Sequence, residues 1–140
     1  MIDKASQPKD FSMNYLSYLK TLIDDLCVEK ISSFIELILK TRDKNKTIFF
    51  IGNGGSASTA SHFVNDISLG SRQFEKPFRA LSLCDNQAVI TAIGNDDGYE
   101  NIFVQQLQTQ ARTDDVLVSI SASGNSPNII KAVNWAKKNQ

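Results

Sequence analysis

Three short, mostly apolar runs constrain the fold of this chain most strongly. They cover residues 47–51, 79–84 and 116–120, and each is followed by small or polar residues and then by a helical pattern. Strands that are buried on both faces of a parallel sheet have such continuous apolar character. Strands that alternate with helices are typical of an α/β fold with right-handed crossovers. We therefore predict a three-layer αβα sandwich around a central parallel sheet.

Helical patterns precede the first run and separate the others. Residues 11–42 contain neither Gly nor Pro, and their apolar side chains recur at steps of three and four. This spacing predicts two amphipathic helices, with a weak break near Cys27 and Val28. The helices expected after the strands cover residues 56–69, 86–93 with 99–112, and 126–138, and a loop covers residues 70–77.

A chain of 140 residues has about the length of one domain. We predict a single domain over residues 11–140, with N-terminal helices at 11–42, an αβα core at 47–140 and a loosely ordered segment at 1–10. The last predicted helix has no Gly or Pro stop signal, and three strands form a small sheet with exposed edges. Because a further strand normally follows such a helix, we expect the core to be incomplete at its C-terminal end.

Composition and charge exclude several classes of protein. Fifteen Lys and Arg balance fifteen Asp and Glu, so the basic excess of a nucleic-acid-binding module is missing. No run approaches the roughly 18–20 apolar residues of a membrane span, and the polar start lacks the apolar core of a signal peptide. Cys27 and Cys84 do not have the spacing of a zinc finger or a disulfide framework. We therefore predict a cytoplasmic protein that binds neither nucleic acid nor membrane.

A glycine-rich turn that can hold an anion follows the first predicted strand. It reads Gly52-Asn53-Gly54-Gly55-Ser56-Ala57. Glycine allows positive φ and close backbone approach, and the start of the next helix offers unpaired N–H groups and a positive dipole end. The Ser56 hydroxyl can cap that helix or donate to a phosphate oxygen. A turn that merely connects a strand to a helix also explains the glycines.

A second turn, rich in hydroxyl groups, follows the third predicted strand. It reads Ser121-Ala122-Ser123-Gly124-Asn125-Ser126-Pro127. Ser126 before Pro127 is a strong helix start, but a capping role requires neither Ser121 nor Ser123. Ligands of parallel sheets bind at the carboxyl ends of the strands where the strand order reverses. If the first and third strands are neighbours, both turns can hold one phosphate.

A dinucleotide-binding fold is the rival interpretation of the first turn. Gly52, Gly54 and Ala57 formally match the GxGxxA pattern. In such folds an acidic residue that binds the ribose follows about 20 residues later, whereas Asp85 lies further along this chain. The Gly-Lys-Ser/Thr sequence of a nucleotide P-loop is also missing. We therefore expect no nucleotide cofactor.

Taken together, the two turns and the stretch between them resemble the SIS (sugar isomerase) domain family, and within it the phosphoheptose isomerases. The matching segments are residues 51–66, the Thr-Ala-Ile-Gly-Asn-Asp run at 91–96 continuing to Phe103, and the Gly-Asn-Ser-Pro-Asn run within 120–132. The resemblance covers nearly the whole chain from about Phe11. It implies an aldose–ketose isomerase that converts sedoheptulose 7-phosphate to D-glycero-D-manno-heptose 7-phosphate by enediol-type proton transfer.

The resemblance also implies a set of site residues. Those that would contact the sugar phosphate, its phosphate group or its hydroxyls are Asn53, Gly54, Gly55, Ser56, Asn95, Asp96, Ser121, Ala122, Ser123 and Ser126. Asp66 falls where the family has a catalytic glutamate, which ligates zinc in members that carry the metal. His62 would be a second zinc ligand.

Two departures from the family pattern concern the catalytic groups. Asp66 is one methylene shorter than Glu, and a base must lie within about 2.6–3.2 Å of its proton or reach it through water. The family's other acid/base, a histidine in its C-terminal part, has no counterpart, because His62 is the only histidine. His62 and Asp66 share one face of a predicted helix, opposite its apolar face. A zinc site needs three or four donors, and a solvated pair explains the same spacing.

Other features have structural explanations beside functional ones. Residues 95–98 have the composition of a turn, Trp135 is predicted to pack, and Tyr99, Phe103 and Leu107 have the spacing of core residues on a helix. The apolar stripes of residues 11–42 exceed what one sheet face needs. Together with the resemblance, they imply a homotetramer formed through the N-terminal helices.

A second class of function stays open at this point. Some SIS relatives keep the phosphate turns, lack the base and bind a protein partner such as a replication initiator. Catalytic turnover, and its loss on substitution of Asp66, separates this regulatory function from the isomerase.

Overall fold

The computed structural model describes residues 7–139. The elements are, in order, α1 (Pro8–Asp24), α2 (Val28–Asp43), β1 (Thr47–Gly52), α3 (Gly55–Asn65), the π-helical turn η1 (Asp66–Gly70), β2 (Arg79–Ser82), α4 (Gln87–Asp96), the 3-10 turn η2 (Tyr99–Asn101), α5 (Val104–Gln110), β3 (Val116–Ile120) and α6 (Pro127–Lys138). The chain divides into two compact units between Glu36 and Leu37.

The three strands form one parallel sheet in the order β2-β1-β3. The register pairs Ile48 with Val116 and Gly52 with Ile120, so the ends of β1 and β3 coincide. The chain adds β2 on one side of β1 and then returns to place β3 on the other side. The strand order therefore reverses between β1 and β3, which are neighbours, and this meets the condition for one ligand to reach both turns.

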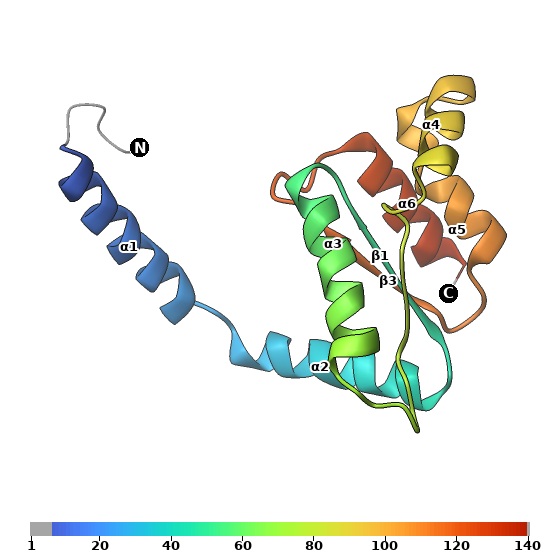
Figure 1. Ribbon diagram of the computed structural model, residues 1–140, viewed down its shortest axis with the longest axis horizontal. Coiled ribbons are helices and arrows are strands. Elements are labelled where there is room, and N and C mark those ends of the chain that lie inside the picture. Colours follow the sequence, from blue (N-terminus) through green and yellow to red (C-terminus); the bar gives the residue numbers. More distant parts are fainter. Residues whose placement is uncertain (1–6, 140) are drawn as a thin grey trace. The chain divides into compact units, whose positions relative to one another are not determined.

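The core has helices on both faces of this sheet, as the sequence predicted. Alternate side chains of a strand point to opposite faces. Phe49 and Ile51 pack in a buried cluster with residues of α5 and α6, including Leu107 and Ile129. On the other face, the Phe50 ring stacks on Phe63 of α3 with 5.0 Å between ring centroids. Figure 1 shows α3 on one side of the sheet and α5 and α6 on the other.

The N-terminal helices break where the sequence predicted. Asp25, Leu26 and Cys27 separate α1 from α2. Helix α1 already begins at Pro8, so residues 8–10, expected to be loosely ordered, form its first turn. The rest of that expectation, at residues 1–6, lies outside the described residues. Within residues 7–139, none of the helices has the length and apolar character needed to cross a membrane.

The predicted helix at 99–112 is broken. It consists of η2 and α5, and it follows Gly98, whose φ is 94°. Ile102 and Phe103 between the two pieces are buried in the core. The side-chain amide of Gln106 donates to the carbonyl of Ile102 at 2.7 Å and to that of Leu83 at 3.0 Å. Burial of Ile102 and Phe103 thus interrupts the helix that the apolar spacing predicts. The composition of this short segment gives no sign of the interruption.

Candidate active site

The first turn is shaped by the close approach of α3 to the end of β1. A Cβ on Gly52 would lie 2.5 Å from the carbonyl oxygen of Ser56, so that only glycine fits. Gly54 has φ 54° and is the N-cap of α3. The N–H of Ser56 donates to the Asn53 carbonyl at 3.0 Å. Because the capping position carries no side chain, Ser56 does not cap this helix, and its hydroxyl lies in the first turn.

The second turn presents hydroxyl groups that the backbone holds in place. The N–H of Gly124 donates to Ser121 Oγ at 3.1 Å, and the N–H of Asn125 donates to Ser123 Oγ at 3.3 Å. A hydroxyl that accepts a hydrogen bond still has its own proton to donate. Both serines therefore stabilise the turn by accepting backbone hydrogen bonds, a role that the sequence did not predict. Each hydroxyl keeps its own proton, which it can donate to a phosphate oxygen.

Ser126 and Pro127 start α6, as predicted. Ser126 is the N-cap residue and Pro127 is the first helical residue. Ser126 is not a side-chain cap, however, since its hydroxyl accepts no hydrogen bond from the first turn. This part of the sequence prediction is wrong. A side-chain cap would accept a hydrogen bond from an N–H group of the first turn. The N–H of Ile129 instead donates to Asn128 Oδ1 at 3.0 Å.

Two asparagines join the turns. Asn53 Nδ2 donates to Asn128 Oδ1 at 2.9 Å, and Asn128 Nδ2 donates back to Asn53 Oδ1 at 2.8 Å. The Tyr99 hydroxyl donates to the same Asn53 oxygen at 3.2 Å. The sequence predicts no separate role for Asn128, and the helical spacing of Tyr99 predicts a core position. The structure corrects the second point, because Tyr99 is 57% exposed, whereas Phe103 and Leu107 are buried as predicted.

Hollows lie beside both turns. A cavity of about 280 Å³ is lined by Asn53, Tyr99, Glu100, Ser126, Pro127 and Asn128. A second cavity, of about 310 Å³, contains Ser121 and Gly124 in its wall, with residues of β3 and α6. Groups from the first turn and from the start of α6 therefore share one cavity, and Ser121 lines the other.

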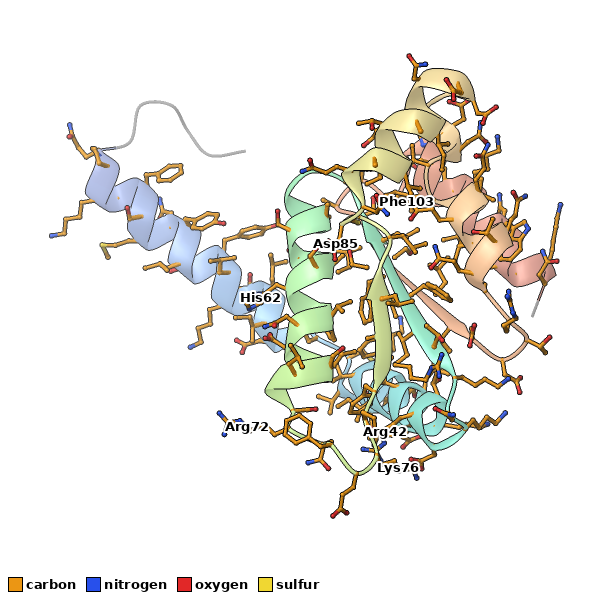
Figure 2. The ribbon with its side chains drawn as sticks, turned by 45° about the vertical axis from the view of Figure 1, so that its right-hand side comes forward. Arg42, His62, Arg72, Lys76, Asp85 and Phe103 are labelled. Carbon is orange, nitrogen blue, oxygen red and sulfur yellow. The ribbon has the colours of Figure 1, made fainter. Side chains whose placement is uncertain are left out.

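The His62–Asp66 pair lies at the other end of α3, where His62 is labelled in Figure 2. The His62 Nε2 and Asp66 Oδ2 atoms are 3.5 Å apart, and the side chains are 76% and 59% exposed, so the pair faces away from the sheet as predicted. At 1.5 Å per residue, the ten residues from Ser56 to Asp66 separate these positions by about 15 Å along the helix. Asp66 also begins the π-helical turn, whose i+5 hydrogen bond joins its carbonyl to the N–H of Ser71 at 2.8 Å.

This pair provides two possible zinc donors. Among residues 7–139, no group of three or more His, Cys, Asp or Glu side chains converges as a metal site would require. A zinc ion needs three or four donors. The described residues alone therefore do not fit a complete zinc site, and we derive no catalytic step through a metal.

Asn95 and Asp96 form the last turn of α4, where both are exposed. The Asn95 amide donates to the Asp96 carboxylate at 2.7 Å. Gly98 follows with positive φ and directs the chain into η2, so the turn composition of this segment has its expected structural use. Contact of Asn95 and Asp96 with a sugar stays a prediction.

A third polar cluster occupies the end of β2. The Asp85 carboxylate, which is labelled in Figure 2, accepts hydrogen bonds from Ser61 of α3 and, at 3.1 Å, from Ser82 of β2. The acid that a dinucleotide fold would offer to a ribose is thus engaged with two serine hydroxyls. Beside it, burial raises the pKa of the Cys84 thiol, which donates to the Gly52 carbonyl at 3.4 Å. Near neutral pH this thiol stays protonated and is not a nucleophile.

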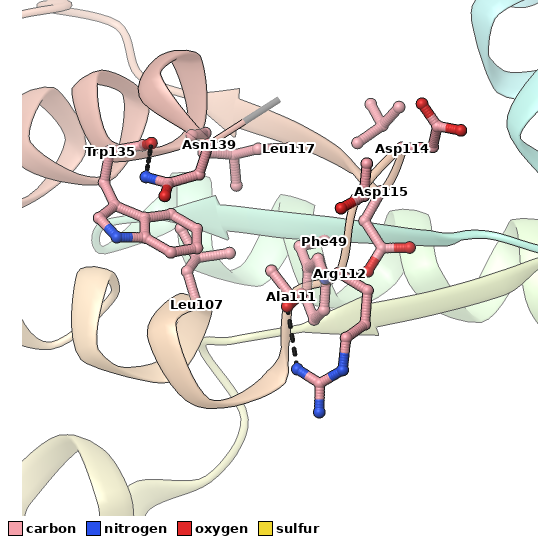
Figure 3. Close-up of a pocket in the computed structure, with 12 residues that line it drawn as sticks. Phe49, Leu107, Ala111, Arg112, Asp114, Asp115, Leu117, Trp135 and Asn139 are labelled. Carbon is pink, nitrogen blue, oxygen red and sulfur yellow. Dashed lines mark hydrogen bonds between the residues drawn. The ribbon is translucent and has the colours of Figure 1, made fainter.

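Another cavity, of about 270 Å³, lies at the opposite end of β3 beside Trp135 (Figure 3). Asp115 and Arg112 in its wall bond to the backbone, and Asp114 pairs with Lys44 at 3.3 Å. Asp115 accepts from the N–H groups of Thr47 and Arg112, each at 2.8 Å, and the Arg112 guanidinium donates to the Ala111 carbonyl at 2.9 Å. Trp135 packs against the buried core, as predicted. These contacts leave the two turns at the carboxyl ends of β1 and β3 as the better candidate for a ligand site.

Comparison with known proteins bears on the family of the chain. The SIS domain profile matches residues 11–140. The phosphoheptose isomerase of Helicobacter pylori strain P12 is 37% identical over 137 residues, which cover 98% of this chain and 70% of that relative. The phosphoheptose isomerase of Clostridium acetobutylicum is 38% identical over 119 residues, which cover 85% of this chain and 61% of that relative.

Solved structures give the same result. The phosphoheptose isomerase of Neisseria gonorrhoeae superposes with a TM-score of 0.82 and 32% identity, over 94% of this chain and 69% of that one. The enzyme of Francisella tularensis gives a TM-score of 0.83 at 28% identity, over 93% and 69%.

The chain therefore belongs to the SIS domain family. Within that family, the curated relatives and solved structures described above are phosphoheptose isomerases. The chain spans 61% to 70% of the length of those proteins.

Proposed function

We propose that this protein is an aldose–ketose isomerase that interconverts sedoheptulose 7-phosphate and D-glycero-D-manno-heptose 7-phosphate. The observation that carries the proposal is the joining of the two turns by Asn53 and Asn128, beside hydroxyls that are free to donate. Such an array of amides and hydroxyls at two strand ends and a helix start is suited to a phosphate group. In this proposal, Ser56, Ser121, Ser123 and Ser126 bind the phosphate.

The separation of the two parts of the site supports a substrate with its phosphate far from its carbonyl. The first turn lies at the start of α3, and Asp66 lies just beyond its last residue. In sedoheptulose 7-phosphate the phosphate and the reacting carbons are at opposite ends of the carbon chain. A substrate whose phosphate lies at the turns therefore has its reacting carbons directed away from them, and the proposal places those carbons near Asp66.

The proposed reaction is a proton transfer between adjacent carbons. The Asp66 carboxylate removes a proton from carbon 1 of the ketose, the electron pair forms the carbon 1–carbon 2 double bond, and the carbonyl oxygen takes up a proton to give the enediol. A proton then returns to carbon 2 while the oxygen on carbon 1 loses its proton and becomes the aldehyde. The substrate gains and loses no atoms overall, so neither an oxidant nor a reductant is needed.

Binding of the phosphate gives a direct test of the ligand. We expect sedoheptulose 7-phosphate at about 100 times its Kd to stabilise the protein by about 2.7 kcal/mol. Unphosphorylated sedoheptulose at the same concentration should cause no shift in Tm, because it lacks the anion. The Ser126→Ala variant, which loses a hydroxyl that α6 does not use, should need more ligand for the same shift. Equal shifts with both sugars, or none with either, would contradict the proposal.

The other expectations have different support. A regulatory function that replaces catalysis is not favoured by the similarity to named isomerases. We propose a cytoplasmic location on the sequence argument given above. Zinc binding by His62 and Asp66 stays a proposal that needs at least one further donor from outside residues 7–139 or from another copy of the chain.

We also propose that the protein forms a homotetramer through its N-terminal helices. Helix α1 has no buried residue, and Leu16 and Ile23 are each 65% exposed. Replacing both with Lys should therefore leave the fold of a single chain intact and lower the oligomer mass seen by light scattering. Ser17→Lys, at an exposed polar position of the same helix, is the matched control. An unchanged mass for the double variant would refute this assembly.

A further inference from the structure

We propose that Asn53, Asn128 and Tyr99 form a hydrogen-bonded latch whose role is to position the substrate-binding segments of the site. This inference deepens the proposed function and rests on it for the identity of the ligand. It adds Asn128 and Tyr99 as positioning residues, and it gives the side chain of Asn53 a role in organising the site.

The hydrogen bonds of the latch are nearly complete within the protein. Asn53 Oδ1 accepts from Asn128 Nδ2 at 2.8 Å and from the Tyr99 hydroxyl at 3.2 Å. Asn128 Oδ1 accepts from Asn53 Nδ2 at 2.9 Å and from the N–H of Ile129 at 3.0 Å. A carbonyl oxygen has two acceptor sites, so both amide oxygens are fully used. A ligand therefore meets the remaining amide protons of this pair, or the backbone around it, rather than these oxygens.

Burial makes the latch costly to open. Asn128 is only 2% exposed although it lines the cavity beside Tyr99, so its own amide group has little contact with water. A buried amide that loses its hydrogen bond pays the desolvation cost of the unpaired group. Reciprocal bonds between two planar amides also fix their relative orientation. Together, these features set the distance between the turn after β1 and the start of α6.

Each member of the latch belongs to a different segment of the candidate site. Asn53 lies in the glycine-rich turn, and Asn128 is the second residue of α6, directly after the hydroxyl-rich turn. Tyr99 begins η2, a few residues after Asn95 and Asp96. The three segments that carry predicted substrate contacts are thus held by one cluster. A shift of about 1 Å in such positioning can lower activity by a factor of 10².

Tyr99 differs from the two asparagines in its exposure. Its hydroxyl is bonded to Asn53, while its ring is exposed and lines the same cavity as Ser126. The bond holds the ring as part of the cavity wall. Tyr99→Phe removes this bond and keeps the ring, so it separates the latch from the packing.

A double-mutant cycle tests the latch. The variants are Asn53→Ala, Asn128→Ala and the double variant, and the readouts are the Kd for sedoheptulose 7-phosphate and the urea midpoint. Circular dichroism first establishes a temperature at which every variant is folded. We expect each single variant to raise Kd by roughly 10- to 100-fold and the double variant to raise it little further, because either change alone opens the same unit. Asn139→Ala, at the far end of α6, should leave Kd unchanged.

The milder variant guards against loss of the fold. Tyr99→Phe should raise Kd, or KM with little change in kcat, by roughly 3- to 10-fold, as expected for one hydrogen bond. Independent effects of Asn53→Ala and Asn128→Ala, which multiply in Kd and add in the urea midpoint, would overturn the latch, and so would a Tyr99→Phe variant identical to wild type. If the wild type does not bind sedoheptulose 7-phosphate, the proposed function fails. The coupling seen in urea still decides whether the latch exists.

Discussion

Asp66→Asn is expected to lower kcat for the interconversion of the two heptose phosphates by about 10²- to 10⁴-fold, the range typical of a lost general base. The amide is almost isosteric with the carboxylate, but it cannot take a proton from carbon 1. Because the Asp66 side chain is more than half exposed and its contacts lie at the surface, the variant should keep the Tm of the wild type within a small margin. The measurement is turnover of purified protein with sedoheptulose 7-phosphate, followed by the appearance of the aldose.

Asp66→Glu is the matched control for this prediction. It restores the longer acid of the family pattern and keeps the ability to accept a proton. We expect it to retain far more activity than Asp66→Asn, and its binding of the sugar phosphate should be unchanged, because the turns lie at the other end of α3. Equal turnover of wild type and Asp66→Asn would show that Asp66 is not the base. Equal binding by both proteins, with no turnover by either, would instead support a regulatory SIS protein.

The sheet and its layers were predictable from sequence because they depend on local signals. The three apolar runs became β1, β2 and β3, and the break between α1 and α2 lies where the apolar stripe is interrupted. Strand order has no such local signal. The crossovers place β1 between β2 and β3. From sequence, the two turns could be expected to meet only if the first and third strands were neighbours, and the structure shows that they are.

The hydrogen-bonded partners in the site were not predictable. Asn53 and Asn128 are far apart in the chain, and an asparagine near a helix start is usually explained by capping. Its helical spacing with Phe103 predicts that Tyr99 lies in the core. The chain instead changes direction at Gly98, which has positive φ, and Tyr99 lies at the surface. The one available signal was that Asn128 belongs to the Gly-Asn-Ser-Pro-Asn run of the family resemblance.

The positions of the catalytic candidates were partly predictable. The four-residue spacing of His62 and Asp66 placed them on one exposed face, and they lie 3.5 Å apart there. Helical periodicity could not predict that α3 changes to a π-helical turn at Asp66, because the change depends on an i+5 hydrogen bond to Ser71. Such turns often occur at functional sites, and this one begins at the proposed base, Asp66.

Gly52→Ala is expected to have the largest effect on stability among small changes near the site. The added Cβ would lie 2.5 Å from the carbonyl oxygen and 2.6 Å from the carbonyl carbon of Ser56, which are backbone atoms of the first turn of α3. A flexible side chain could move away, but here either β1 or α3 must shift. Overpacking typically costs about 1–3 kcal/mol and occasionally more, and we expect the upper end of this range. Thermal and urea denaturation followed by circular dichroism measure the loss.

Gly55→Ala is the matched control, because the added Cβ at Gly55 meets nothing within 4 Å and the residue is the first of α3. Alanine is favoured over glycine in a helix by up to about 1 kcal/mol, so this variant should be as stable as the wild type or slightly more stable. A shift of α3 in Gly52→Ala would also move Asn53 relative to Asn128 and weaken phosphate binding, even at temperatures where the protein is folded. If Gly52→Ala and Gly55→Ala have the same stability, the turn is not held by the close packing of α3 on β1, and the positioning of its phosphate-binding groups needs another cause.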